Sequence, residues 1–248
     1  MMEKSINKTS RYRFTIIVPI YNEIENIPDL GQRLMKFLPD CKVPACVLFV
    51  DDGSDDGSAV ELKRLCYDVE DFFYICFERN AGLSAALKAG IDYTESEYVG
   101  YMDADLQTAP EDFNLLLEDI AEYSMVTGIR ANRKDTGFKK IQSRIANSFR
   151  RMMTNDGAAD TGCPLKVLHT DCAKRIPLFK GMHRFLPALV LLQDGGTYKQ
   201  IPVRHFPRVA GKSKFHLWNR LLGPFADCFA YRWMKPRYIN YKVKDSDL

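Results

Sequence analysis

The sequence lacks the features that mark secreted, membrane-spanning and disulfide-stabilised proteins. Residues 1–13 are polar and no apolar core follows a basic start, so a secretory signal is not expected. Apolar runs such as 185–192 are far shorter than the 18 or so residues that a membrane-spanning helix requires. The seven cysteines are odd in number and form no CxxC pair. This argues against a disulfide framework or a zinc site, and for reduced thiols in the cytosol.

A large excess of charge of one sign is also absent. The net charge of +3 is too small to imply nucleic acid as a partner, although it permits a local basic patch for phosphates. With 46% hydrophobic and 27% charged residues, the composition is that of a folded globular protein. The length of 248 residues suits one large α/β domain or two small ones.

Short apolar strands alternate with helical segments along most of the chain. This alternation predicts an α/β fold with a mainly parallel central sheet and helices on both faces. Ligands of such sheets bind in the crevice at the carboxyl ends of the strands. We expect strands at 14–23, in the apolar part of 45–57, at 72–77, 97–106 and 125–130, and helices at 26–38, 58–66, 82–93 and 110–122.

Polar clusters lie at the carboxyl ends of three of these strands, at 21–23, 51–52 and 103–105. In the stretch VGYMDADLQTAP, Asp103 and Asp105 are one residue apart, and in an extended chain their side chains would share a face roughly 6–7 Å apart. Two carboxylates so placed repel each other unless a cation lies between them or solvent spreads their charge. The pair is therefore a solvated strand end or a metal site, and the convergence of three clusters favours a functional site.

Six segments in this order resemble the family-2 glycosyltransferases with the Rossmann-like GT-A fold: VPIYNE, VDDGSDDGS, RNAGLSAALKAG, MDADLQTAPE, GIR and RVAGKSK. The match is to the polyprenyl-phosphate branch, similar to dolichol-phosphate mannose synthases and bacterial undecaprenyl-phosphate sugar transferases, and runs from about residue 14 to 233. DADLQ and RVAGKSK are its specific elements. The resemblance implies an inverting transferase that moves a sugar from a UDP- or GDP-sugar to a polyprenyl phosphate for cell-envelope glycan or lipid modification.

The resemblance also implies roles on the donor side. Asp105 and Gln107 match the family's metal positions, and Asp103 matches a position that contacts the ribose or the metal. A divalent ion, Mg²⁺ or Mn²⁺, bound by these oxygens would neutralise the diphosphate that leaves. The nucleotide-sugar pocket is expected from Pro19, Tyr21, Glu23, Asp51, Asp52, Gly82 and Asp103, with Asp52 favoured over Asp51 as the contact.

Open alternatives are that Pro19 and Glu23 simply end a strand and that Gly82 opens an ordinary helix. The stretch around Gly82 departs from the GKLGL pattern of dolichol-type enzymes, so mannose is not implied as the sugar.

Basic residues match the family's contacts to the acceptor phosphate. Arginine suits bidentate phosphate binding, and lysine adds a point charge. The positions are Arg130, Arg144, Ser148, Arg208 and Lys214, and the catalytic set implied by the resemblance is Asp103, Asp105, Arg130 and Arg208.

The segment 181–192 has neither the carboxylate pair nor the QxxRW motif that many polymer synthases of the family carry. A phosphate monoester has a second pKa near about 6 and needs no base to attack. The missing base is therefore what a lipid-phosphate acceptor predicts. Two interpretations of His183 remain, either as a general base or as a structural polar contact.

The region 213–237 combines aromatic and leucine residues at helical spacing with arginine and lysine. This composition is typical of an amphipathic helix at an anionic membrane surface, and Gly223-Pro224 is expected to divide it into two short helices. Packing on the domain or self-association into a homo-oligomer is the alternative.

We expect a flexible leader at 1–12, a glycosyltransferase domain at 13–212, these helices at 213–237 and a polar tail at 238–248. The protein would be cytoplasmic and peripheral on the cytoplasmic face of the membrane.

Two other functions remain open. One is a glycosyltransferase acting on a hydroxyl of a glycan or soluble acceptor, against which the missing base counts. The other is a catalytically silent binding protein of the same fold, against which the intact Asp103, Asp105 and Gln107 count.

Overall fold

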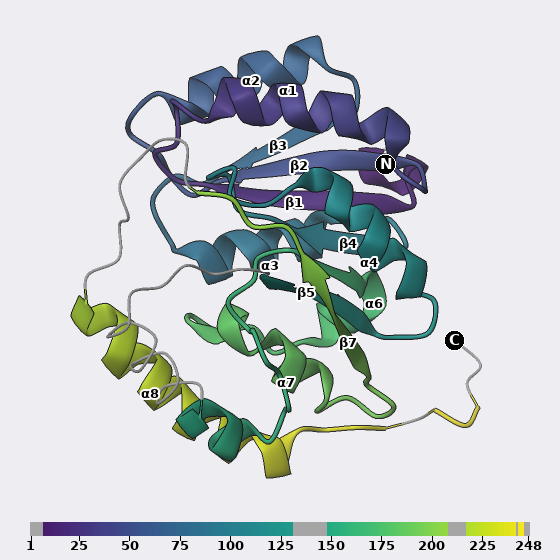
Figure 1. The fold of residues 1–248 in the computed structure, drawn as a ribbon, viewed down its shortest axis with the longest axis vertical. Coiled ribbons are helices and arrows are strands. Elements are labelled where there is room, and N and C mark those ends of the chain that lie inside the picture. The colour runs from purple at the N-terminus through teal and green to yellow at the C-terminus, as the bar shows by residue number, and fades with distance from the viewer. Residues whose placement is uncertain (1–6, 131–147, 208–216, 242, 246–248) are drawn as a thin grey trace.

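The computed structural model describes residues 7–130, 148–207, 217–241 and 243–245, with the backbone alone at 217–222 and 224. Its centre is a seven-stranded sheet in the order β3-β2-β1-β4-β6-β5-β7 (Figure 1). All pairs are parallel except those of β6, which runs antiparallel to β4 and β5. The mainly parallel sheet expected from the sequence is thus confirmed. The strands are β1 (Phe14–Ile20), β2 (Ala45–Asp51), β3 (Phe72–Cys76), β4 (Tyr98–Tyr101), β5 (Met125–Arg130), β6 (Lys166–His169) and β7 (Tyr198–Val203).

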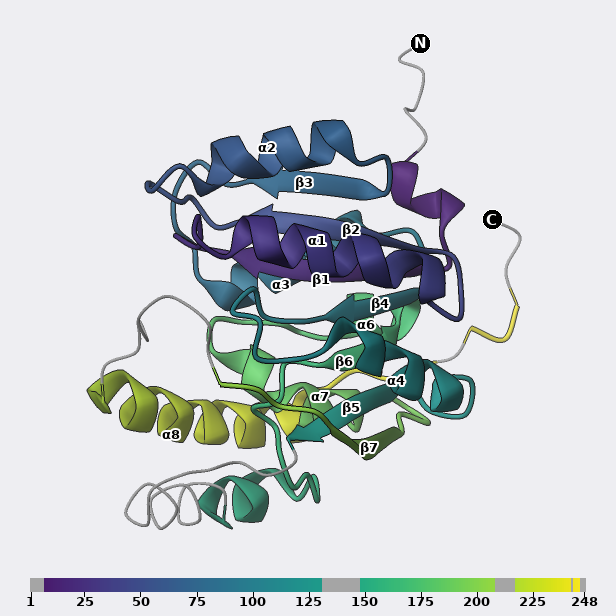
Figure 2. The same ribbon diagram turned by 45° about the horizontal axis from the view of Figure 1, so that its top comes forward.

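Helices cover both faces of this sheet (Figures 1 and 2). One face carries α1 (Ile27–Phe37), α2 (Ser58–Asp68) and α4 (Phe113–Asp119), over a buried cluster that includes Phe14 and Phe49. The other carries α3 (Leu83–Tyr93), α6 (Thr170–Arg175), α7 (Leu186–Val190) and α8 (Leu217–Met234). Burying each large apolar side chain contributes about 1.5–3 kcal/mol, so both faces of the central strands are held firmly.

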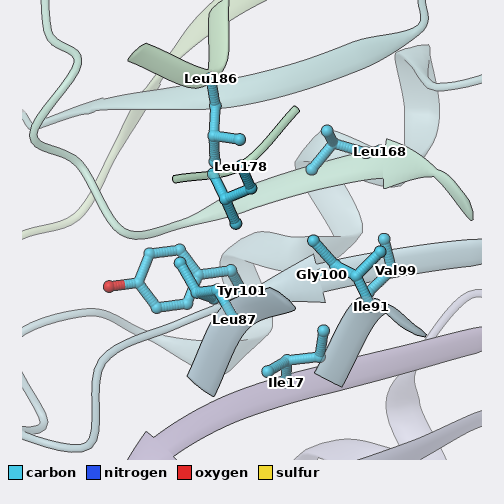
Figure 3. A pocket seen from close by; sticks show the side chains of 9 residues that line it. All are labelled: Ile17, Leu87, Ile91, Val99, Gly100, Tyr101, Leu168, Leu178 and Leu186. Atoms are coloured by element: carbon cyan, nitrogen blue, oxygen red, sulfur yellow. The ribbon is translucent and has the colours of Figure 1, made fainter. Parts of the chain in front are cut away.

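A small apolar pocket lies on the second face, beneath β4 (Figure 3). The Tyr101 ring forms one wall, and Figure 3 shows its oxygen directed away from the other lining residues. Because the rest of the lining is hydrocarbon, we interpret this pocket as a gap in core packing. It is lined by Ile17, Leu87, Ile91, Val99, Gly100, Tyr101, Leu168, Leu178 and Leu186.

Strand predictions failed in two places. β6 and β7 were not expected, because β6 has only four residues and begins with a lysine, and β7 carries Lys199 and Gln200 and contains Pro202. The strand expected over 97–106 ends at Tyr101, so Asp103 and Asp105 lie in a loop instead of on an extended chain. Leu106 in that loop has φ of 59°, in the left-handed region, which is incompatible with a continuing strand.

The division of the terminal helix at Gly223-Pro224 was also wrong, since α8 is one helix of 18 residues. A proline inside a helix removes one backbone hydrogen bond. A helix at the surface tolerates that loss because water can satisfy the carbonyl left without a partner. None of the helices in the described ranges is both long enough and apolar enough to cross a membrane.

Candidate active site

The strand order reverses between β1 and β4, where the chain leaves the β1–β2–β3 half of the sheet and continues on the other side. In sheets of this kind ligands bind outside the carboxyl ends of the strands at that point. β1 and β4 are hydrogen-bonded neighbours up to the pair Ile17–Tyr101, so the loops that follow them leave the same edge. The clusters at 21–23, 51–52 and 103–105 all belong to this edge, as the sequence predicted.

The loops that follow β1 and β2 are joined to each other. The Asn22 side chain donates to Asp55 Oδ1 at 2.7 Å and accepts from the Asp55 amide at 3.0 Å. The amide of Glu23 donates to Ser58 Oγ at 3.0 Å. Pro19 is partly exposed and Tyr21 is 37% exposed, so both residues lie at the surface of this edge.

Asp51 and Asp52 are both buried but differ in their contacts. Both Asp52 oxygens accept hydrogen bonds from 80–82, including the Ala81 amide at 2.7 Å and the Gly82 amide at 2.8 Å. Asp51 Oδ2 accepts from the Ser54 amide at 3.3 Å, whereas its buried Oδ1 has no hydrogen-bond partner among the residues that the structure describes. Of the two, Asp51 carries the oxygen that a ligand could satisfy, although the sequence favoured Asp52.

Gly53 explains how the Asp52 contacts are possible. It has φ of 68°, and a Cβ built there would lie 2.4 Å from the carbonyl carbon of Arg79. Only glycine permits so close an approach in this conformation. The 79–82 backbone therefore packs directly on the turn after β2, and the Gly82 amide is bonded to Asp52 instead of pointing at a ligand.

Asp103 lies directly after β4 and accepts a hydrogen bond from the hydroxyl of Tyr101. Burial and the nearby charge of Asp105 raise the pKa of Asp103 to about 6, against the opposing effects of Tyr101, Lys166 and Arg130. Mutual repulsion of this kind is what a bound cation would relieve.

Asp105 and Gln107 form a compact pair of oxygen donors. Asp105 is 8% exposed, and its Oδ1 accepts from the Gln107 amide at 3.2 Å. The Gln107 side chain donates its Nε2 to the carbonyl of Phe206 at 3.3 Å, so its Oε1 is the atom that could meet a cation.

The donor chemistry at this edge fits a hard divalent cation. Two carboxylates and an amide oxygen suit Mg²⁺ or Mn²⁺, which usually take further oxygens from substrate phosphates. No cluster of three or more histidine, cysteine, aspartate or glutamate side chains that could hold a metal exists in the described part of the chain. A site of this composition needs phosphate oxygens to complete it.

Arg130 ends β5 and is held by a carboxylate that the sequence did not reveal. Asp160 accepts from Arg130 Nε and Nη2, each at 2.9 Å, and from the Arg130 amide at 3.2 Å. Both side chains are only 16% exposed. Burial alone would lower the pKa of Arg130, but Asp160 raises it, so the guanidinium stays charged. Among the described residues no hydrogen bond uses Nη1, so this nitrogen could meet a ligand.

Gly162 is part of the same arrangement. A Cβ at this position would lie 2.7 Å from Arg130 Nη2, so a larger residue would displace the guanidinium. The Gly162 amide also donates to Asp160 Oδ1 at 3.0 Å. Gln200 on β7 fixes the backbone around Asp160, because it accepts from the Ala159 amide and donates to the Asp160 carbonyl.

Lys166 is a second buried cation that the sequence did not reveal. It is 1% exposed, donates to the carbonyl of Cys163, and lies 5.9 Å from the centre of the Tyr101 ring. Burial lowers its pKa, while the charges of Asp160 and Asp103 oppose that change. It is too deeply buried to meet a substrate, and its amino group lies within electrostatic reach of Asp103 and Asp160.

His183 lies beside the start of α3. Ser84 Oγ accepts from the Gly181 amide at 3.0 Å and forms a hydrogen bond with His183 Nδ1 at 2.7 Å. Burial lowers the pKa of His183 to about 3. The ring is therefore neutral at pH 7 and too weak a base to take a substrate proton, which favours the structural interpretation.

Part of the expected acceptor site lies outside the described residues: Arg144, Arg208 and Lys214. Ser148 is described and exposed, at the start of the helical residues 148–154.

This helical stretch packs on α8 through Phe149, whose ring stacks on Phe225 at 4.7 Å and contacts Phe229. Phe225, Phe229 and Trp233 recur every four residues and are 49%, 52% and 62% exposed, whereas Cys228 and Tyr231 face the core. We call these three aromatic residues the α8 aromatic row.

Known proteins resemble the chain in sequence over most of its length. The model of glycosyl transferase family 2 matches residues 15–176. An undecaprenyl-phosphate 4-deoxy-4-formamido-L-arabinose transferase of Pectobacterium carotovorum is 32% identical over 203 residues, 81% of this chain and 62% of that protein. A dodecaprenyl-phosphate galacturonate synthase of Rhizobium johnstonii is 31% identical over 206 residues, 81% of this chain and 61% of that protein. The chain thus spans about three fifths of the length of these relatives.

Solved structures share the fold at low sequence identity. A mannosyltransferase from Pyrobaculum calidifontis in complex with GDP-Man and Mn²⁺ has a TM-score of 0.62 at 19% identity, covering 96% of this chain and 67% of that one. A glucosyl-3-phosphoglycerate synthase from Mycobacterium tuberculosis, with Mn²⁺, UDP and its product, has a TM-score of 0.66 at 10% identity, covering 95% and 84%.

Proposed function

Because the chain belongs to glycosyltransferase family 2 and has the GT-A fold, we propose that it transfers a sugar from a nucleotide diphospho-sugar to a polyprenyl phosphate. Two sequence relatives are named for sugar transfer to undecaprenyl or dodecaprenyl phosphate, which supports a lipid phosphate as the acceptor here. The product would feed cell-envelope glycan or lipid modification.

The observation that carries this proposal is a cation held in a fixed orientation at the active-site edge. Asp160 orients Arg130 and leaves Nη1 to bind an acceptor phosphate. His183 is neutral and its Nδ1 is bonded to Ser84. A phosphate that is already largely dianionic attacks the anomeric carbon through its own oxygen, while the bond from that carbon to the diphosphate oxygen breaks. Attack opposite the leaving group inverts the anomeric configuration.

Asp105, Gln107 and Asp103 would hold Mg²⁺ or Mn²⁺ at this edge. A bound cation would neutralise the charge that develops on the departing diphosphate. Asp105 and Gln107 are preorganised by the hydrogen bond between them, and Tyr101 orients Asp103.

The nucleotide would bind over β1 and β2. Tyr21 offers a ring for the base, and Asp51 Oδ1 would accept from a base N–H, since it is buried without another partner. Both uracil and guanine carry such a group, so a UDP-sugar and a GDP-sugar both fit this description.

The α8 aromatic row would bring the enzyme to its lipid acceptor on the cytoplasmic face of the membrane. Exposed aromatic rings are favourable at the headgroup level, and Arg232, Lys235 and Arg237 follow on the same helix end to attract anionic lipids. Arg237 lies 4.8 Å from the Trp233 ring, so charge and aromatic surface are contiguous.

The test is transfer of labelled sugar from a panel of UDP- and GDP-sugars to a short polyprenyl phosphate. We expect transfer with Mg²⁺ or Mn²⁺, none in excess EDTA, and recovery when the metal is restored. Asp105→Asn should lower turnover by orders of magnitude, whereas Asp68→Asn, an exposed acid at the end of α2, should not. Full activity in EDTA would contradict the metal assignment. Transfer to a prenol or glycan hydroxyl in place of the phosphate would favour the alternative acceptor.

A further inference from the structure

The loop that carries Asp105 and Gln107 is joined at its far end to residues that follow β7. The Phe206 amide donates to the Gln107 carbonyl at 2.9 Å, and the Gln107 side chain donates back to the Phe206 carbonyl at 3.3 Å. These two residues are 99 positions apart in the sequence. The backbone and the side chain of Gln107 are thus both fixed from the β7 side.

A second junction lies two residues earlier on the same segment. Arg204 donates its amide to Asp112 Oδ2 at 2.7 Å and its Nε to Asp112 Oδ1 at 2.8 Å, and its Nη2 also reaches Glu111 at 3.3 Å. Asp112 is 3% exposed, so its charge is buried against the planar guanidinium. Arg204 Nη2 also lies 2.7 Å from Asp112 Oδ1, so two guanidinium nitrogens contact the same oxygen, a contact that we call the fork. It fixes the orientation of the guanidinium as well as its distance, which a lysine cannot do.

Between these junctions and β4 the loop has no regular structure to support it. Leu106 holds φ of 59° while its side chain is 1% exposed. A bulky residue keeps this conformation only where its surroundings impose it. Tyr101 holds the near end through Asp103, and the segment after β7 holds the far end.

We propose that Arg204 is a positioning residue for the divalent cation and its diphosphate. The fork on Asp112 fixes the position of the far end of the loop, and the adjoining Phe206 contact fixes the orientation of the Gln107 side-chain amide. As a result, Asp105 and Gln107 present their oxygens at a fixed separation. Arg204 acts through the 107–112 segment and does not itself touch the ligand. This inference rests on the proposed function, which assigns Asp105 and Gln107 to a metal.

The experiment measures Mn²⁺ binding to the full chain by electron paramagnetic resonance, in the presence of saturating UDP and, in parallel, GDP. Arg204→Ala should weaken Mn²⁺ binding about ten- to a hundredfold, the range found when a partner that orients a metal ligand is lost. Arg204→Lys, which keeps the charge but not the fork, should weaken it less. Asp112→Asn tests the same fork from its other side, should an Arg204 variant fail to fold.

The chain offers a matched control in Arg13, which forms a similar fork on Glu97 at 2.7 and 2.6 Å with the same 54% exposure, at the opposite edge of the sheet. Arg13→Ala should bind Mn²⁺ like the wild type. Equal Mn²⁺ affinity in Arg204→Ala and the wild type would overturn the positioning role but not the metal assignment. The same conclusion would follow if Arg13→Ala lost as much Mn²⁺ affinity as Arg204→Ala. Absence of Mn²⁺ binding to the wild type with either nucleotide would overturn the metal assignment and the positioning role with it.

Discussion

Asp51 and Asp52 are adjacent in the sequence, yet their surroundings differ: Asp52 binds the backbone of 80–82, and we propose that Asp51 binds the nucleotide. Asp51→Asn should weaken UDP or GDP binding roughly ten- to a hundredfold, because a hydrogen bond to a charged group contributes about 1.5–3 kcal/mol. Its free energy of unfolding should stay unchanged or rise, since the variant replaces a buried carboxylate that has an unpartnered oxygen by a neutral amide. Titration calorimetry and urea unfolding would measure the two quantities.

Asp52→Asn is the matched comparison. Its amide group would face backbone N–H groups of 80–82, which costs about 1–3 kcal/mol of stability. If Asp52→Asn instead left stability intact and abolished nucleotide binding, the sequence-based preference for Asp52 would be correct after all.

His183 makes stability depend on pH. Its pKa is lowered to about 3 in the folded protein, against about 6.5 when unfolded, so the unfolded chain binds the proton first as pH falls. Stability is complete above pH 6.5 and declines below it, by up to about 1.4 kcal/mol per pH unit. Lowering the pH from 7.5 to 5 should therefore reduce the free energy of unfolding by about 2 kcal/mol less in His183→Gln than in the wild type, as measured by urea unfolding. Identical pH dependence in both proteins would contradict the buried neutral imidazole.

The same residue tests the chemistry of the acceptor. His183→Gln should reduce turnover at pH 7.5 far less than the ~10²–10⁴-fold expected when a general base is lost. A collapse of kcat with folding intact would show that His183 takes a proton from the acceptor, and the hydroxyl alternative would then be favoured.

At the scale of elements, the loop between residues 155 and 165 positions Arg130 at the end of β5. Gly162→Ala should raise the KM for polyprenyl phosphate about tenfold, equivalent to ~1.4 kcal/mol, because its Cβ displaces the guanidinium. The KM for the nucleotide sugar should not change. Since the obstructed atom is the end of a flexible side chain, the melting temperature should stay close to that of the wild type.

The control for this prediction is the Arg130→Ala background. If Gly162 acts through Arg130, Gly162→Ala should have no further effect there. An equal loss of activity in both backgrounds would mean that Gly162 shapes the loop in some other way.

Elements with a strong local signal were predictable from the sequence, and those defined by tertiary contact were not. β1 and β2 are almost entirely apolar runs, and α1 and α3 carry helical periodicity. β6 was missed because Lys166 makes it look like surface, although the fold buries that lysine. Asp160 was missed because no local sequence pattern indicates that it pairs with Arg130, 30 positions away. Arg130 itself was found through the resemblance of GIR to the family.

On the scale of the whole molecule, one edge of the sheet collects the donor and metal residues, while α8 lies on the far side of the sheet from α1 and α2 (Figures 1 and 2). The buried residues Cys228 and Tyr231 already attach α8 to the core. Phe225 and Phe229 of the α8 aromatic row pack on Phe149, yet the three residues of the row are 49%, 52% and 62% exposed, and packing alone does not explain that exposure.

Membrane binding is the explanation that we propose, and it gives the last prediction. Replacing Phe229 and Trp233 by serine should weaken binding to anionic liposomes several-fold or more in a sedimentation assay, because the exposed apolar area would otherwise be buried at the interface. Activity on a short water-soluble prenyl phosphate should be spared. The matched control is serine at Tyr67, which is 91% exposed on α2 at the other side of the sheet and should leave liposome binding unchanged. If the α8 variant binds liposomes normally but changes its mass in solution, the aromatic row mediates self-association, the alternative that the sequence left open.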